Sequence, residues 1–124
     1  MKIKITTNKA PQATGAFSQG IVSDDLIFTG GQIYLSSEGV LIDGSIEDKT
    51  RQVMENLRYI LEAGGASFKD VVKTTIYITD MAEYKAITDI YAEYVEDPYP
   101  ARETVCVKEL PLGASLEISM IARK

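Results

Sequence analysis

The sequence predicts an α+β domain in which one mixed sheet carries both of its helices on a single face. Segments typical of strands occur near the start, the middle and the end of the chain, and two other segments have helical periodicity. Their order is strand, strands, helix, strand, helix, strand, strand, which favours one sheet over separate layers. The 124 residues fit a single domain over 1–124 that buries roughly two thirds of the surface of the unfolded chain.

The N-terminal part is predicted to form a short strand followed by a hairpin. The strand covers residues 2–6, and the hairpin covers residues 21–34 with turn-forming side chains at residues 23–25. The pair Gly30 and Gly31 interrupts the second arm. Paired glycines inside a strand indicate a bulge or the close approach of another group to the backbone.

The first helix is predicted from its start signal and its stop signal. Ser45 and Asp48 have the spacing of a capping box, and the pair Gly64 and Gly65 ends the periodic run. Apolar residues recur at helical spacing between these signals, namely Val53, Leu57, Ile60 and Leu61. The β-branched segment 71–79 that follows predicts a long strand.

A second helix and two closing strands complete the predicted sheet. The helix begins after Asp80 and ends before Pro98. The helical spacing is marked by Tyr84, Ile87, Tyr91 and Tyr94, and this aromatic-rich stripe is more typical of a core than of a cofactor site. The closing strands cover residues 102–108 and 115–123, with a turn at 110–113.

Two charged residues on the closing strands are the strongest indication of a functional site. Alternation places Arg102 on one strand face with Thr104 and Cys106, and places Glu117 opposite the apolar residues of its own strand. Leaving a charge unpaired near an apolar interior costs several kcal/mol, so both residues require a partner or a ligand. Cys106 is expected to be a small core residue, because the chain has no histidine that could activate it.

The predicted helices leave the second face of the sheet without a cover. Several strands have apolar or small residues on both faces, and a domain of this size has no further helix to form a second layer. Self-association is therefore predicted.

Composition excludes several classes of function. The net charge is −5 and the basic residues are scattered, which argues against a nucleic-acid surface. The absence of histidine excludes catalytic triads and histidine-based metal sites. No apolar run approaches the ~18 residues of a membrane span. The single cysteine and the lack of a signal-peptide core at the first residues predict a cytoplasmic protein.

The chain resembles the RidA family, also called the YjgF or YjgF/L-PSP family, of imine and enamine deaminases. The resemblance runs almost from end to end and is specific because many blocks occur in the same order, at residues 10–11, 15–20, 29–33, 52–57, 60–65, 70–75, 98–102, 110–114 and 116–118. It implies a chorismate-mutase-like subunit and a homotrimer with barrel-like sheet packing in its centre. It also implies three clefts between neighbouring subunits, no metal and no organic cofactor.

The resemblance further implies hydrolysis of 2-enamino or 2-imino acids, such as 2-aminoacrylate, to 2-oxo acids and ammonia. Arg102 stands where the family places its substrate arginine, and a guanidinium can clamp a carboxylate with paired hydrogen bonds. Glu117 stands at the family's acid position and would manage the attacking water. Backbone amides near Gly31 and Thr104 are the expected anchors for the substrate, and Phe17 is the expected stacking residue.

The chain departs from the family pattern at several of these positions. Phe17 replaces a frequent tyrosine, Gly30 a serine and Thr88 an asparagine, and the pair Glu103-Thr104 replaces Ser-Cys or Ser-Thr. These departures bear on substrate preference and rate.

The same residues are also compatible with a structural role or with a different function. Arg102 could pair with Glu117 or Glu103 across strands as a purely structural contact. The cleft could instead bind small carboxylates such as 2-oxo acids as a sensor, without turnover. Some family members are labelled translation inhibitors or ribonucleases, but an acidic chain without histidine is poorly suited to that activity.

Overall fold

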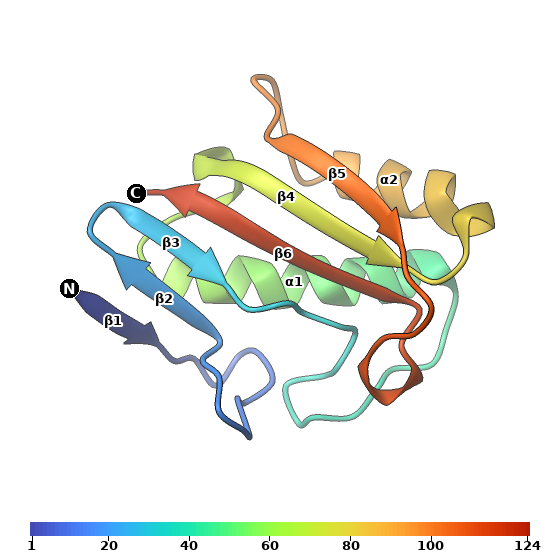
Figure 1. Ribbon diagram of the computed structural model, residues 1–124, viewed down its shortest axis with the longest axis horizontal. Helices are drawn as coiled ribbons and strands as arrows, with labels where there is room; N and C mark the ends of the chain where they lie inside the picture. Colours follow the sequence, from blue (N-terminus) through green and yellow to red (C-terminus); the bar gives the residue numbers. More distant parts are fainter.

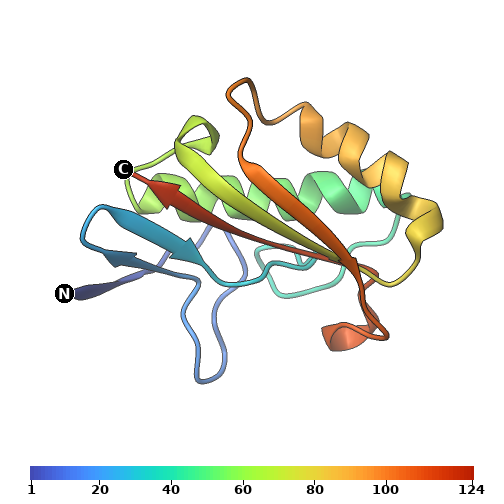
Figure 2. The same ribbon diagram turned by 45° about the horizontal axis from the view of Figure 1, so that its top comes forward.

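Six strands form one mixed sheet, and both helices lie behind it on the same face (Figures 1 and 2). The computed structural model describes all residues 1–124. The strand order is β1-β2-β3-β6-β4-β5, so β1 and β5 are the edges of the sheet. The strands are β1 (Lys2–Ile5), β2 (Gly20–Ser23), β3 (Leu26–Thr29), β4 (Val71–Ile78), β5 (Ala101–Cys106) and β6 (Leu116–Arg123). The predicted fold class of a mixed sheet with two helices is confirmed.

The predicted N-terminal hairpin forms, but its second strand is shorter than expected. β2 and β3 pair in antiparallel register, and Asp24 in the turn between them has φ 54°. β3 ends at Thr29 rather than near residue 34. Beyond the two glycines, Gln32 forms only an isolated bridge with Ile118 of β6. After Thr29 the chain therefore no longer pairs with β2, and at Gln32 it lies beside β6.

The first helix, α1 (Ile46–Ala63), begins and ends where its capping signals predict. The Ser45 hydroxyl accepts a hydrogen bond from the Asp48 amide at 3.0 Å, and the Asp48 carboxylate accepts one from the Ser45 amide. Gly64 caps the other end and is buried; a Cβ on it would lie 2.7 Å from Cδ1 of Ile5. A larger residue at this position would therefore push β1 away from the helix.

Asn56 connects the buried face of α1 to the segment after β3. The side chain is fully buried, and its amide nitrogen donates to the carbonyl oxygens of Ile33 (3.3 Å) and Leu35 (2.8 Å). Replacement by alanine would leave both carbonyl groups without this donor. We expect Asn56→Ala to lower the free energy of unfolding by about 2–4 kcal/mol. The measurement is the urea midpoint at fixed protein concentration, and an unchanged midpoint would contradict this assignment.

The second helix, α2 (Tyr84–Ala92), connects the only parallel pair of strands. Met81–Glu83 forms a short 3₁₀ turn ahead of it, with the Asp80 carboxylate accepting from the Ala82 amide. The chain then returns as β5 beside β4 in parallel register. This crossover places α2 behind the β4–β5 edge of the sheet (Figure 2).

The register of the strands separates the two faces of the sheet. The helix face, defined here as the face covered by α1 and α2, receives the fully or almost fully buried side chains of β4 and β6, which are Val71, Thr74, Ile76, Ile78, Leu116, Ile118, Met120 and Ala122. The opposite face, called the open face below, is covered by no helix (Figure 1). No helix of the chain has the length and apolarity needed to cross a membrane.

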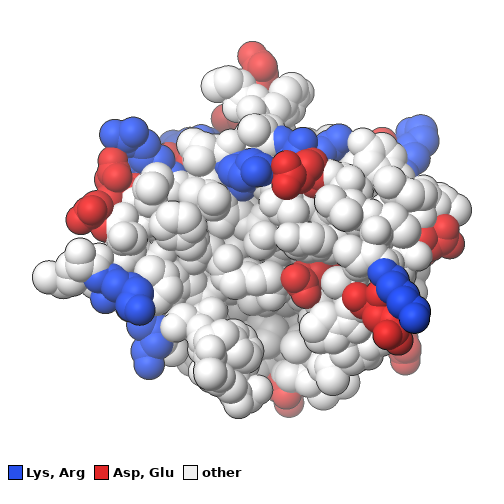
Figure 3. All heavy atoms as spheres, viewed as in Figure 1, with Lys and Arg blue, Asp and Glu red and all other residues white.

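The open face has few charges near its centre (Figure 3). Phe28 is 40% exposed and Val105 43% exposed on this face. Three further residues share it by register and are partly exposed, namely Ile21, Tyr77 and Ile121. The uncovered face expected from the sequence is therefore present.

One predicted core residue is not in the core. Cys106 is exposed at the end of β5, whereas a small buried residue was expected. The reason is the position of the strand, because β5 has a neighbour on one side only and five of its six residues are exposed. The expectation of a core role for Cys106 is wrong for the single chain.

Candidate functional site

Arg102 lies on β5 with its side chain on the helix face. It pairs in register with the buried Thr74, and both point toward α2. Nη2 donates a hydrogen bond to the Tyr84 hydroxyl at 3.0 Å, and Cζ lies 5.5 Å from the centre of the Tyr91 ring. Because the residue is exposed, its guanidinium can meet a solute.

No acidic residue pairs with Arg102. Glu103, the next residue, faces the other side of the sheet and contacts Lys73, with the Oε1 to Nζ distance at 3.6 Å. Glu117 also lies on the open face, because its register partner is Tyr77. Arg102 therefore forms no structural ion pair with either glutamate within one chain.

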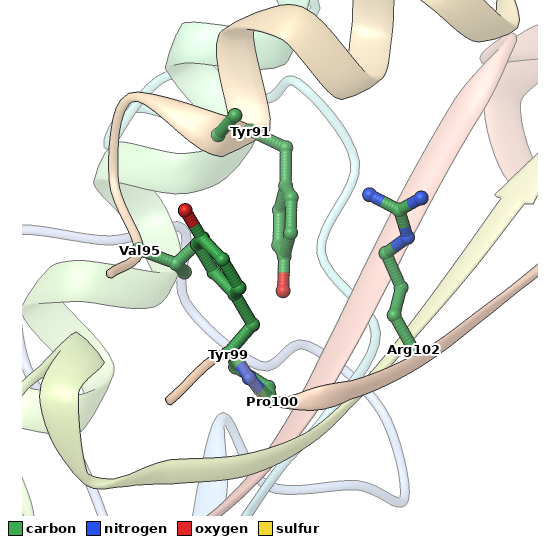
Figure 4. Close-up of a pocket in the computed structure, with 6 residues that line it drawn as sticks. Tyr91, Val95, Tyr99, Pro100 and Arg102 are labelled. Carbon is green, nitrogen blue, oxygen red and sulfur yellow. The ribbon is translucent and has the colours of Figure 1, made fainter. Parts of the chain in front are cut away.

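A cavity of about 400 Å³ opens beside Arg102 (Figure 4). Residues from the end of α2 and the segment leading into β5 line it, namely Tyr91, Ala92, Val95, Tyr99, Pro100 and Arg102. Tyr91 is held firmly, since its hydroxyl donates to the buried Thr74 hydroxyl at 2.9 Å. Burial raises the pKa of Tyr91, although the hydrogen bond to Thr74 and the charge of Arg102 act in the opposite direction.

Glu117 lies on β6 on the open face, half-buried and without an ion-pair partner or hydrogen bond. Burial raises the pKa of this carboxyl group above the usual range of a glutamate. Gly31 lies directly against it: a Cβ at Gly31 would be 2.7 Å from Cδ of Glu117. The predicted close approach at the paired glycines is thus present, and its partner is the Glu117 carboxyl group.

Gly31 also presents a free backbone donor beside that carboxyl group. The amide of Gly30 donates to the carbonyl oxygen of Gln19, and the amide of Gln32 donates to that of Ile118. The Gly31 amide between them makes no backbone hydrogen bond, and the residue is exposed. Glu117 and Gly31 therefore form a pair of polar groups that can both reach a ligand on the open face.

The remaining predicted residues lie apart from this pair. Thr104 shares the helix face with Arg102, and its buried hydroxyl oxygen has no hydrogen-bond partner. Phe17 is 61% exposed on the loop between β1 and β2 and lines a separate cavity of about 230 Å³. The chain thus brings Arg102 together with Thr104, and Glu117 with Gly31, but holds the two pairs on opposite faces of the sheet.

The tyrosines around Arg102 were not identified as functional from the sequence. Their helical stripe was predicted to be core, which is correct for Tyr91 but not for Tyr84, which is 38% exposed. The spacing of seven residues does place both rings on one face of α2. That they face Arg102 depends on the crossover to β5, which no local pattern reveals.

Comparison with known proteins gives matches along almost the whole chain. A family model described as Endoribonuclease L-PSP matches residues 7–124. The protein named Reactive Intermediate Deaminase A, chloroplastic, from Arabidopsis thaliana is 45% identical over 119 residues, which are 95% of this chain and 64% of that protein. The protein named 2-iminobutanoate/2-iminopropanoate deaminase from Homo sapiens is 37% identical over 95% of this chain and 87% of its own length.

Solved structures have the same fold over the same extent. A Thermotoga maritima protein proposed to be an endoribonuclease is 46% identical, with a TM-score of 0.97 over 100% of this chain and 98% of that one. The structure of E. coli TdcF with bound serine is 33% identical, with a TM-score of 0.92 over 98% of each chain. From the family match and these relatives, the chain belongs to the L-PSP family, which is also known as the RidA family.

Proposed function

We propose that the protein hydrolyses reactive 2-enamino and 2-imino acids to 2-oxo acids and ammonia. The observation that carries this proposal is the presence of two ionisable groups that form no ion pair within the chain, the guanidinium of Arg102, which is bonded only to the neutral Tyr84 hydroxyl, and the carboxyl group of Glu117. A 2-imino acid needs one group of each kind, because it has a carboxylate next to an electrophilic carbon that water must attack. The names of the relatives support the same chemistry.

The reaction needs no redox partner. An enamine such as 2-aminoacrylate first gains a proton on carbon and loses one from nitrogen to become the imine. Water then adds across the C=N bond, with its oxygen bonding to carbon and its proton passing to Glu117. The same proton returns to nitrogen, which gives a carbinolamine. The hydroxyl proton of this intermediate then passes to nitrogen as the C–N bond breaks and the C=O bond forms, and the products are a 2-oxo acid and ammonia. A glutamate whose pKa is raised is a suitable group to accept and return this proton.

Arg102 would bind the substrate carboxylate during these steps. A guanidinium holds a carboxylate by two parallel hydrogen bonds, which fixes both the position and the plane of the substrate. The backbone amides at Gly31 and Thr104 would add donors, and Phe17 would shape the cleft. Serine, which is bound in the TdcF structure, also has a carboxylate and a nitrogen attached to the same carbon atom.

The complete site would require two chains, because Arg102 and Glu117 lie on opposite faces of one sheet. A neighbouring chain packed against the open face would bring its own Arg102 to the Glu117 of the first. We propose a homotrimer in which the open faces form a central barrel-like core and three clefts each combine residues from two subunits. The apolar residues of the open face support burial of this surface.

The direct test is to generate 2-aminoacrylate in situ and follow pyruvate release with and without the protein. We expect the protein to accelerate release, and equal rates would contradict the proposed activity. Light scattering tests the assembly, and a stable monomer would contradict the shared cleft.

A binding function without turnover is the second candidate, and it is favoured by the serine bound to TdcF. In this case the cleft would sense 2-oxo acids or amino acids through the same arginine. Binding of 2-oxobutanoate without any acceleration of imine hydrolysis would support this function. Ribonuclease activity, which the family model's name suggests, fits less well with a net charge of −5 and no histidine.

A further inference from the structure

Arg102 is the one arginine of the chain whose guanidinium forms no ion pair with an acidic side chain. Arg51 pairs with Glu93, with the Nη1 to Oε1 distance at 2.9 Å. Arg58 pairs with two glutamates of its own helix, and Arg123 pairs with Asp25 at 2.9 Å. The hydrogen bond and the ring contacts of Arg102 are instead with tyrosines: its Nη2 donates to the Tyr84 hydroxyl, and its Cζ lies 6.0 Å from the Tyr84 ring centre and 5.5 Å from that of Tyr91.

This arrangement orients a guanidinium without neutralising it. An acidic side chain in the place of Tyr84 would form a charge-assisted bond with Arg102 and would compete with the carboxylate of a ligand. A neutral hydroxyl fixes one nitrogen of the guanidinium, and the ring faces attract its charge through their quadrupoles. The other nitrogen atoms stay available for a bidentate contact. The guanidinium therefore has a fixed orientation, and its positive charge remains available to bind an anion.

The position of Tyr84 suits this role. It is the first residue of α2, and it is partly exposed, so its hydroxyl does not support the buried core. Tyr91, about two helical turns further on, is buried, and its hydroxyl donates a hydrogen bond to the Thr74 hydroxyl. Of the two rings, Tyr91 forms a fixed wall (Figure 4), while Tyr84 supplies the directional contact.

We propose that Tyr84 is a positioning residue that holds the Arg102 guanidinium in its carboxylate-binding orientation while leaving its charge unpaired. This inference rests on the proposed function, since it assumes that Arg102 binds the carboxylate of a 2-imino or 2-oxo acid. Tyr84 then governs affinity for the acid and has little influence on the rate of the chemical step.

The test compares Tyr84→Phe and Tyr84→Glu with the wild type. Calorimetry gives the Kd of 2-oxobutanoate, and pyruvate release from 2-aminoacrylate gives KM and kcat separately. We expect Tyr84→Phe to raise Kd and KM about tenfold, because one hydrogen bond to a charged group is lost, with kcat changed less than about twofold. We expect Tyr84→Glu to raise both by about a hundredfold, although it keeps an acceptor near Arg102, because the new carboxylate competes with the ligand.

Tyr59→Phe is the matched control, because Tyr59 also lies against an arginine: Cζ of Arg58 is 4.6 Å from its ring centre. It is expected to behave as wild type. Thermal midpoints show whether each variant is folded. A Tyr84→Phe variant with unchanged Kd and KM would overturn the inference, and so would a Tyr84→Glu variant no weaker than Tyr84→Phe. If the wild type neither binds 2-oxobutanoate nor turns over 2-aminoacrylate, the proposed function fails first and the inference falls with it.

Discussion

Mixing the inactive variants Arg102→Ala and Glu117→Gln is expected to restore about a quarter of the wild-type deaminase activity, because each cleft would take its arginine from one chain and its glutamate from the next. Random assembly of the two variants gives each cleft one chance in about four of receiving both native residues. Alone, Arg102→Ala is expected to lower kcat/KM by about 10²–10³-fold, since removing one partner of a hydrogen-bonded charge pair costs about 2–5 kcal/mol.

The experiment requires that chains exchange, so both variants are unfolded together and refolded, and pyruvate release from 2-aminoacrylate is measured. Wild type treated in the same way shows how much activity survives refolding. Arg102→Ala mixed with the double variant is the matched control, because no cleft in that mixture can contain an arginine. Recovery no greater than in this control would mean that the site does not combine these residues from two chains.

Glu117→Gln is expected to reduce kcat by about 10²–10⁴-fold while leaving KM within a few-fold of wild type. Glutamine retains the size and hydrogen-bonding capacity of the side chain, but it cannot accept the proton of water and return it to nitrogen. Gly31 allows the replacement sterically, because it has no side chain to collide with the new amide. A variant that keeps its kcat would exclude Glu117 from the chemical step.

The pH dependence gives an independent check on Glu117. Because burial raises the pKa of this carboxyl group, the active carboxylate is lost on acidification at a higher pH than for an ordinary glutamate. The pH profile of kcat/KM should therefore show an acidic limb in the wild type that is missing from the residual activity of Glu117→Gln. An identical limb in both proteins would assign it to another group.

The same raised pKa has a consequence of known sign for stability. The folded chain binds the Glu117 proton more tightly than the unfolded chain does, so the associated stability is present below the unfolded pKa and lost as pH rises through the folded pKa. Glutamine does not ionise, so Glu117→Gln does not lose stability in this way as pH rises. Its thermal midpoint relative to wild type should therefore be more favourable at neutral pH than under acidic conditions.

Much of the fold was predictable because its signals are local. The capping box at Ser45 and the glycines after residue 63 mark both ends of α1, and the β-branched segment marks β4. The exposure of Cys106 was not predictable, because it depends on which strand ends the sheet. The hairpin was predicted too long for a similar reason: Gln32 pairs with Ile118, which lies far away in the sequence.

The candidate site was predictable only in part. Arg102 and Glu117 were identified because charges on apolar strands are rare, and the contact between Gly31 and Glu117 fits the predicted close approach. That the arginine and the glutamate face opposite ways follows from the register of β5 and β6 against β4, which the sequence does not reveal. The role of Tyr84 depends on the same long-range placement.

The position of β5 at the sheet edge also bears on how the protein avoids aggregation. This strand is bonded to β4 on one side only, so an isolated chain presents a row of unsatisfied backbone groups next to the exposed Val105 and Cys106. Strands of other molecules can form backbone hydrogen bonds with such an edge, which leads to aggregation. Any arrangement that covers this edge strand would therefore protect the chain against such uncontrolled association.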